Sequence, residues 1–322
     1  MRIAPWPHLL RRCLLLCLLP CALALPATAA WAQAQAPSQA RTQTPPGGEA
    51  EAVRRGETVF HAAGGCGCHT DYKAKGQPLA GGRGLKTPFG TFYSTNVTPD
   101  PETGLGNWSA ADFVRAMREG IGPQGQHYFP VFPYTSFTRM SDADLADLWA
   151  YLRAQPAVRQ PNKAHDVWPP FGWRIGVGPW KLLFFRPARF APDPARSESW
   201  NRGAYLAGAV AHCGECHTPR NLLGGLQASL RFAGSVDGPE GELAPNITPD
   251  RETGIGKWSA KDLEYFLETG FKPDGDDAQG LMGQVIEHGY GKIGAGDRQA
   301  IAEYVRSLPP IVNTVRAPAK KK

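Results

Sequence analysis

The pentapeptide Cys213-Gly214-Glu215-Cys216-His217 constrains this chain more than any other stretch. Two thiols three residues apart lie on one face of a helical turn, where both can add to the vinyl groups of a haem. The adjacent imidazole then reaches the iron. A lone Cys-x-x-Cys would equally suit a zinc half-site or a redox dithiol. The following histidine, a second related motif and an export signal favour a covalent c-type haem.

The second related motif is Cys66-Gly67-Cys68-His69-Thr70, which is one residue short. On a helix, cysteines two apart point about 200° from each other, so both cannot meet one haem edge without distortion. Gly64, Gly65 and Gly67 give the backbone freedom to bend. Either both cysteines form thioethers or only Cys68 does, and a first copy without haem is the remaining alternative. We predict two covalently bound haem c groups, attached through Cys66, Cys68, Cys213 and Cys216.

An internal repeat accompanies the two motifs. The run Asn96-Val97-Thr98-Pro99-Asp100 recurs 150 residues later as Asn246-Ile247-Thr248-Pro249-Asp250. Arg55-Gly56 likewise matches Arg202-Gly203, ten residues before the first cysteine of each motif. Self-similarity of this kind indicates two copies of one structural unit.

Each copy carries the signals of helices only. We expect helices over residues 51–63 and 199–211, and capping boxes at Ser109 and Ser259. Gly120 and Gly270 should end the helices that follow these serines. Further helices should begin near Ser141 and Asp297. The sequence therefore predicts an all-α fold of two tandem domains, each wrapped round a covalent haem.

The ends of the chain have a different character. Arg2, Arg11 and Arg12 precede a short apolar run, which predicts a signal peptide and export to the periplasm. The run is too short to span a bilayer, so we expect no transmembrane helix in the mature chain. The predicted boundaries are a signal peptide at 1–32, a disordered leader at 33–50, a first domain at 51–155, a Pro/Trp-rich interdomain segment at 156–198, a second domain at 199–310 and a basic tail at 311–322.

The cysteine and charge counts exclude structural disulfides and argue against a nucleic-acid-binding protein. Three of the seven cysteines lie in the signal peptide and the other four in the two motifs, which leaves none for a structural disulfide. The net charge is +6, but the signal peptide and the basic tail together carry +7. The folded body is therefore close to neutral, and we expect no nucleic-acid partner.

The iron ligands can be enumerated. His69 and His217 are the predicted proximal ligands. Met282, in the loop before the last helix, is the predicted distal ligand of the second haem, because a thioether favours ferrous iron and raises the potential. For the first haem, Met140 is the preferred distal ligand. His127 and an open site are the alternatives, and Met117 fits a helix core better.

The repeated runs 96–109 and 246–259 resemble the cytochrome c subunits of periplasmic gluconate, sorbitol and alcohol dehydrogenases, and related diheme cytochromes. The resemblance implies cytochrome c-like domains and electron relay from a partner dehydrogenase to the respiratory chain. It also implies Cys213, Cys216 and His217 as the haem motif and Met282 as distal ligand. Relatives often have methionine where Phe132 stands here. Many also have a third haem or a C-terminal membrane helix.

The leading hypothesis is therefore a periplasmic diheme electron carrier rather than a stand-alone catalyst. Its donor would be a periplasmic dehydrogenase and its acceptor quinone, an oxidase or another cytochrome. The alternative is a diheme enzyme of the peroxidase or thiosulfate-oxidising type, with one open or labile haem site. Such an enzyme would need an acid–base pair beside open iron, and none stands out in the sequence. A haem-based sensor is a third possibility, but no effector domain accompanies the repeats.

Overall fold

The computed structural model describes residues 48–65 and 67–316, which belong to one compact unit. The predicted signal peptide, most of the leader, Cys66 and the end of the basic tail lie outside this part. The α-helices are α1 (Gly48–Ala62), α2 (Ala110–Glu119), α3 (Tyr134–Phe137), α4 (Asp142–Arg153), α5 (Val177–Phe184), α6 (Glu198–Tyr205), α7 (Gly214–His217), α8 (Ala260–Thr269), α9 (Gly280–His288) and α10 (Ala295–Arg306).

The remaining helices are short. The π-helix η4 (Leu206–Val210) continues α6. The 3-10 helices are η1 (Gly67–His69), η2 (Tyr72–Ala74), η3 (Arg174–Gly176), η5 (Ala228–Leu230), η6 (Pro239–Gly241) and η7 (Tyr290–Lys292). The described chain is thus mostly helical, as the sequence predicts.

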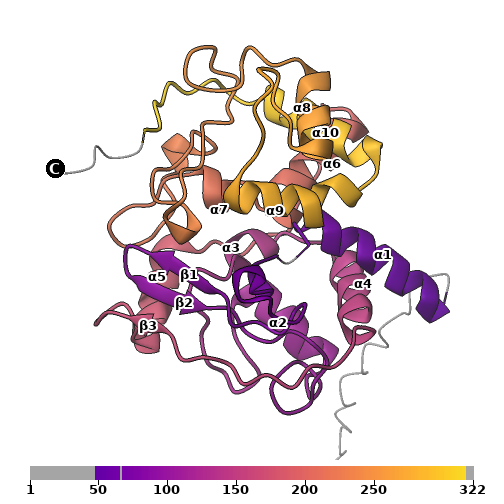
Figure 1. Cartoon of the computed structure of the whole chain (residues 1–322), viewed down its shortest axis with the longest axis vertical. Helices are drawn as coiled ribbons and strands as arrows, with labels where there is room; N and C mark the ends of the chain where they lie inside the picture. Colours follow the sequence, from indigo (N-terminus) through magenta and orange to yellow (C-terminus); the bar gives the residue numbers. More distant parts are fainter. Residues whose placement is uncertain (1–47, 66, 317–322) are drawn as a thin grey trace, which may run out of the picture. The chain divides into compact units, whose positions relative to one another are not determined.

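The first and last helices of each repeat cross closely at a glycine. Figure 1 shows α1 alongside α4 and α6 alongside α10. A Cβ atom at Gly56 would lie 1.9 Å from the carbonyl oxygen of Asp147, and one at Gly203 would lie 1.9 Å from that of Ala300. Since no side chain fits at such a distance, these glycines set how closely the helices approach. Close packing therefore explains why the two glycines recur.

The arginine before each of these glycines fastens the same crossing. Arg55 binds both carboxylate oxygens of Asp147, at 2.8 and 2.9 Å. Arg202 binds both carboxylate oxygens of Asp297, at 2.8 Å each. Paired N–H···O bonds of this kind fix orientation as well as charge. The repeated Arg-Gly pair therefore fixes how the first and last helices of each repeat cross.

The predicted helix ends are confirmed at both copies of the capped helix. Ser109 and Ser259 form capping boxes with Asp112 and Asp262, respectively. Gly120 and Gly270 end these helices with φ values of 61° and 83°, a left-handed conformation that glycine adopts without strain.

The all-helical prediction was wrong for one segment of the first repeat. Strands β1 (Gly84–Thr87), β2 (Gly90–Tyr93) and β3 (Asp166–Val167) form a small antiparallel sheet in that order. Leu85 pairs with Phe92 across β1 and β2, and both side chains are buried while their neighbours along each strand are more exposed. Successive side chains of a strand point to opposite faces, so Leu85 and Phe92 share one face of the hairpin, where Phe92 packs against Phe129 and Val177. Gly90, with a φ of 127°, allows the tight connection.

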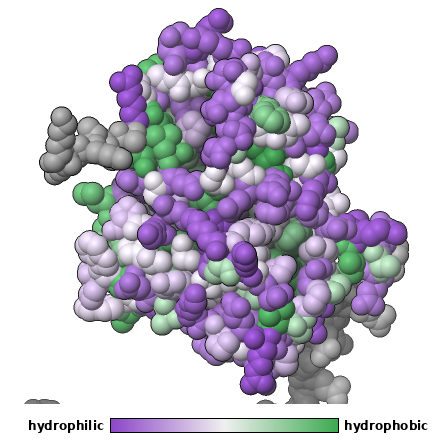
Figure 2. All heavy atoms as spheres, viewed as in Figure 1, coloured by the Kyte–Doolittle hydropathy of each residue, from purple (hydrophilic) through white to green (hydrophobic). Residues whose placement is uncertain are grey.

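The interdomain segment 156–198 runs against both repeats. The side-chain amide of Asn96 donates to the Val158 carbonyl at 2.7 Å, and the Trp180 indole donates to the Leu223 carbonyl at 2.8 Å. On the face seen in Figure 2, hydrophilic residues predominate and hydrophobic residues form separate small groups. Within the ranges described, no helix is long and apolar enough to cross a bilayer. Several large apolar side chains of the segment face solvent, namely Trp168, Trp173, Ile175, Leu182 and Leu183.

Candidate functional site

The second cysteine motif folds as one helical turn after the end of η4. Cys213 is the N-cap of α7, and Cys216 lies within it. The His217 amide donates to the Cys213 carbonyl at 3.0 Å and closes the turn, so both thiols share one side. Both thiols are free and half-buried. Burial raises the pKa of Cys213 to about 11 and that of Cys216 to about 12, so both stay protonated at neutral pH.

The imidazole of His217 is held by a main-chain carbonyl. Its Nδ1 lies 2.7 Å from the carbonyl oxygen of Pro245. Because a carbonyl can only accept, Nδ1 carries the proton, and the lone pair of Nε2 is left for a metal. Burial lowers the pKa of His217 and outweighs the opposing effect of this hydrogen bond. The neutral form, which is the one that binds metals, is therefore favoured.

His69 has the same arrangement in the first repeat. Its Nδ1 lies 2.7 Å from the carbonyl oxygen of Thr95, and burial lowers its pKa. The carbonyl of each histidine also accepts from a glycine amide at 2.8 Å, from Gly81 for His69 and from Gly234 for His217. The two predicted proximal ligands are thus held by the same pair of hydrogen bonds to the main chain.

The repeated asparagine fixes the carbonyl that holds each histidine. Asn246 directly follows Pro245, and its Oδ1 accepts from the amide and the hydroxyl of Thr248, at 2.9 and 2.7 Å. Its Nδ2 donates to the Ile311 carbonyl at 2.7 Å. Asn96 makes the same three contacts in the first repeat, with Thr98 and Val158, at 2.9, 2.7 and 2.7 Å. Both asparagines are buried, so these contacts are shielded from water.

The first cysteine motif is described only from Gly67 onward. Cys68 lies in the 3-10 helix η1 beside His69. Solvent reaches its thiol, yet protein atoms surround it closely enough for burial to raise its pKa. Cys66 lies outside the described residues, so its thioether stays a prediction.

The candidate distal ligands lie in different surroundings. Met282 stands on α9 rather than in a loop, and it is half-buried against the core. Met140 has no exposed surface and belongs to the core itself, and Met117 is buried on α2. The Nδ1 atom of His127 lies 2.9 Å from the Lys181 ammonium. The role of each of these four residues toward iron stays a prediction.

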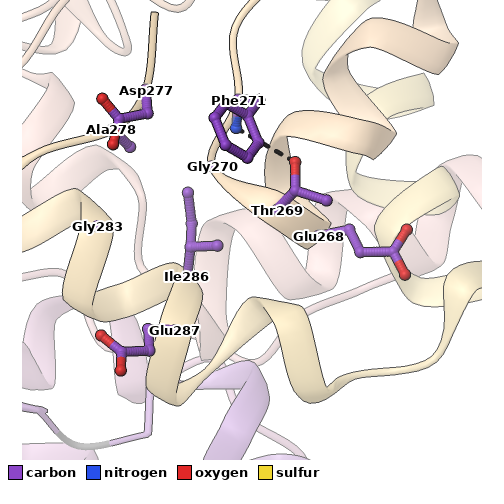
Figure 3. Close-up of a pocket in the computed structure, with 9 residues that line it drawn as sticks. All are labelled: Glu268, Thr269, Gly270, Phe271, Asp277, Ala278, Gly283, Ile286 and Glu287. Atoms are coloured by element: carbon purple, nitrogen blue, oxygen red, sulfur yellow. Dashed lines mark hydrogen bonds between the residues drawn. The ribbon is translucent and has the colours of Figure 1, made fainter.

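A cavity of about 310 Å³ lies beside α9 in the second repeat, between the end of α8 and the loop at Asp277. Figure 3 shows the residues that line it, with Ile286 projecting from α9 and Glu268 turned away at the end of α8. The Phe271 amide donates to the Thr269 hydroxyl at 3.2 Å in its wall. No residue of the second cysteine motif lines this cavity, so it is separate from the thiols.

Comparisons with known proteins bear on this geometry. A family model described as Cytochrome c matches residues 53–156. The chain is 41% identical over 261 residues to a diheme cytochrome c-type protein of Cereibacter sphaeroides, covering 80% of this chain and 86% of that protein. The chain belongs to the cytochrome c family.

Dehydrogenase subunits are also similar to this cytochrome. It is 38% identical over 276 residues to the fructose dehydrogenase cytochrome subunit of Gluconobacter japonicus, covering 84% of this chain and 56% of that subunit. It is 44% identical over 275 residues to a nicotinate dehydrogenase subunit of Pseudomonas putida, covering 82% of this chain but 22% of that subunit. The cytochrome therefore spans less than two thirds of either dehydrogenase subunit.

The described residues fit haem c. In the second repeat, two free thiols share one side of a turn and the next imidazole leaves Nε2 available. In the first repeat, His69 is held in the same way beside a free thiol on Cys68. Cys213, Cys216 and His217 would hold one group and Cys68 and His69 the other.

The segments around the candidate distal ligands contact the other repeat at or beside its cysteine motif. The helix α3, which lies between Phe132 and Met140, contacts the second motif, and α9, which carries Met282, contacts Gly65 and η1 of the first repeat. The hydroxyls of Thr135 and Ser136, on α3, donate to the carboxylate of Glu215 at 2.6 and 2.7 Å. Glu215 stands between the two cysteines of the second motif. In the other direction, a Cβ atom at Gly65 would lie 2.3 Å from the carbonyl oxygen of His288, at the end of α9. The two repeats therefore meet through the segments that carry the sites.

The groups that position the two histidines are not evident from the sequence. Thr95 and Pro245 act through their carbonyl oxygens, which no side-chain motif reveals. A signal was nevertheless available, since each residue directly precedes the repeated Asn-x-Thr run. Glu215 stands between the two cysteines, where the motif itself specifies no residue type. Its three partners, including Arg220 at 2.6 Å, become visible only in the folded chain.

Proposed function

We propose that this cytochrome is a periplasmic electron carrier with two covalent haem c groups. Cys213, Cys216 and His217 hold one group, with Met282 as the distal ligand of its iron. Cys68 and His69 hold the other, together with Cys66. The donor is a partner dehydrogenase, and the acceptor is quinone, an oxidase or another cytochrome of the respiratory chain.

This proposal rests on the hydrogen bonds that hold His69 and His217 in the same way in the two repeats. In both repeats an Nδ1–carbonyl hydrogen bond of 2.7 Å leaves Nε2 free beside a free cysteine. Haem c supplies a one-electron couple between ferric and ferrous iron. The protein holds each imidazole in one orientation, and that fixed orientation keeps the reorganisation on electron transfer small. A hydrogen bond to Nδ1 also makes Nε2 a stronger donor.

The direction of the relay is supported by the relatives. Two of them are named as subunits of fructose and nicotinate dehydrogenases. The predicted signal peptide supports the periplasm, where such a donor would be met. Contacts of α3 and α9 with the other repeat, at or beside its cysteine motif, keep the two sites adjacent, which favours passage of an electron between them.

Voltammetry of the haem-loaded full-length protein tests the proposal. We expect two one-electron waves, and reduction of both haems when a periplasmic sugar or alcohol dehydrogenase and its substrate are added without oxygen. Oxidation by a quinone analogue should follow. Absence of any reduction by such dehydrogenases, with both haems present, would contradict a role in relay.

The distal assignment has its own test. Met282→Ala should lower the potential of one wave, because loss of a thioether destabilises ferrous iron. It should also remove part of the near-infrared methionine–iron band. Met117→Leu, at a buried position on α2, is the matched control and should change neither. An unchanged band in Met282→Ala would exclude Met282 as a ligand.

A further inference from the structure

We propose that the first haem has no methionine ligand and keeps one coordination position for a small exogenous ligand of the carbon monoxide class. The inference rests on the proposed function, because it assumes that the first repeat carries haem. It replaces Met140 as distal ligand with an open position, and it makes the two haems chemically unequal.

Phe132 and Met282 occupy equivalent positions in the two repeats. The two repeats keep an offset of 150 residues through the loop that precedes both positions. The Tyr128 amide donates to the Gly120 carbonyl at 2.8 Å, and the Ala278 amide donates to the Gly270 carbonyl at the same distance. Four residues further along stand Phe132 and Met282. The first repeat thus presents a phenyl ring where the second presents a thioether.

Phe132 lies in an aromatic group that offers the iron no thioether. Its ring centroid is 5.8 Å from those of Tyr128 and Phe137 and 6.4 Å from that of Tyr134. Phe132 is half-buried and packs against the main core. An apolar aromatic distal side suits a neutral diatomic ligand better than a charged one.

Met140 has a different structural role. It is the residue before the N-cap Ser141 of α4, and Leu145 stands at the fourth position of that helix. An apolar pair at these two positions packs together and fixes the entry of the chain into a helix. Met140 and Leu145 are both fully buried in one core. Met282, the predicted ligand of the second repeat, is by contrast only half-buried.

The second repeat shows what this position requires. The residue before the N-cap Gly294 of α10 is Ile293, which is buried as well. Isoleucine cannot bind iron, so an apolar side chain is all that the position needs in either repeat. The thioether of Met140 is thus incidental to its place in the core.

His127 is poorly placed to take over. The Lys181 ammonium, which also donates to the Gly120 carbonyl at 3.1 Å, lies 2.9 Å from Nδ1 of His127. An ammonium can only donate, so Nδ1 accepts and the proton of the neutral ring sits on Nε2. A protonated Nε2 has no lone pair for iron. Met117, the other methionine of this repeat, is buried on α2 beside Phe113.

Carbon monoxide titration of the haem-loaded, dithionite-reduced protein tests the proposal. We expect one carbon monoxide bound for every two haems in the unaltered protein. Phe132→Met should abolish this binding and add intensity to the near-infrared methionine–iron band of the oxidised protein. Met140→Leu should change neither the stoichiometry nor the band. Met282→Ala should raise the stoichiometry to two carbon monoxide molecules for every two haems.

The outcomes separate this proposal from the proposed function. Two haems by mass with no carbon monoxide bound would overturn the open site and leave the carrier intact. Carbon monoxide binding that appears only in Met140→Leu would restore Met140 as the ligand. A single haem by mass would instead refute the proposed haem count, and the open site with it. If Phe132→Met does not fold, the unaltered protein and Met140→Leu still decide the question.

Discussion

The Nδ1 atom of His217 lies 2.7 Å from the carbonyl oxygen of Pro245, a residue 28 positions away along the chain. The same distance joins His69 to Thr95 in the first repeat. In both repeats the carbonyl is the last group before an asparagine whose side chain is engaged in hydrogen bonds. The repeated run therefore acts on the site through the main chain.

Asn246→Ala should lower the free energy of unfolding of the protein. The substitution removes the partner of the Ile311 carbonyl and of the Thr248 amide. A buried group left without its hydrogen bond costs about 1–3 kcal/mol. Guanidinium denaturation of the oxidised protein measures the loss. Asn107→Lys, which introduces the residue of the second repeat and removes only a solvent-exposed hydrogen bond to the Pro101 carbonyl, is the control and should cost much less. Equal effects of both substitutions would contradict the assigned role.

Gly203→Ala should disrupt the crossing of α6 and α10. The new methyl group would lie 1.9 Å from the Ala300 carbonyl oxygen, so the helices must separate. Overpacking of this kind typically costs about 1–3 kcal/mol. Gly178→Ala in α5 is the matched control, since nothing lies within 4 Å of its Cβ position. There, alanine should be neutral or stabilising. Thermal unfolding of the two variants side by side measures the difference, and equal melting temperatures would refute the packing argument.

The ion pairs of Glu240 with Lys73 and Arg83 join the second repeat to the first, and they should make the stability of the folded protein depend on pH. Burial acts to raise the pKa of Glu240, but hydrogen bonds from Lys73 and Arg83, at 2.7 and 2.6 Å, outweigh it and lower the pKa. A lowered folded-state pKa means that this stabilisation is present above the ordinary carboxyl value of about 4.5 and is lost as the pH falls below it. Glu240→Gln should therefore be less stable than the unaltered protein at pH 7, with the difference shrinking toward pH 3. A difference that stays constant with pH would show that the charge of Glu240 contributes nothing.

Glu215 should couple the two repeats energetically. Its carboxylate accepts from Thr135 at 2.6 Å across the repeats. We expect Glu215→Gln and Thr135→Ala each to destabilise the protein. Their double mutant should lose less than the sum by about 0.5–3 kcal/mol, the usual range for residues in contact. Thr58→Ala is a control for threonine loss at an exposed site. Strict additivity of Glu215 and Thr135 would mean that their contact does not hold the repeats together.

The sequence predicts what is encoded locally. Ser109, Gly120 and their partners in the second repeat act within one helix, so spacing alone identifies caps and stops. The recurrence of Gly56 and Gly203 indicates importance but not cause, because the carbonyl that forbids a side chain lies more than 90 residues away in each repeat. Contacts such as Thr135 with Glu215 depend on how the repeats meet, which no local pattern specifies.

Two features were missed for different physical reasons. The strands at Gly84–Thr87 and Gly90–Tyr93 span only four residues each, too few for a periodic signal, and β3 joins them from a distant segment. The left-handed Gly64 and Gly65, with φ of 79° and 65°, do use the backbone freedom that the sequence indicates. At Gly65 the lack of a side chain also makes room for the carbonyl of His288, at the end of α9 of the other repeat, which only the tertiary contact reveals.

The central claim is that both repeats carry covalent haem, and the intact mass of the mature, haem-loaded protein tests it most directly. The measurement should be repeated on Cys213→Ser/Cys216→Ser and on Cys68→Ser. We predict two added haem masses for the unaltered protein and one for each variant, because each change removes attachment in one repeat only. One haem in the unaltered protein, with Cys68→Ser unchanged, would contradict the account.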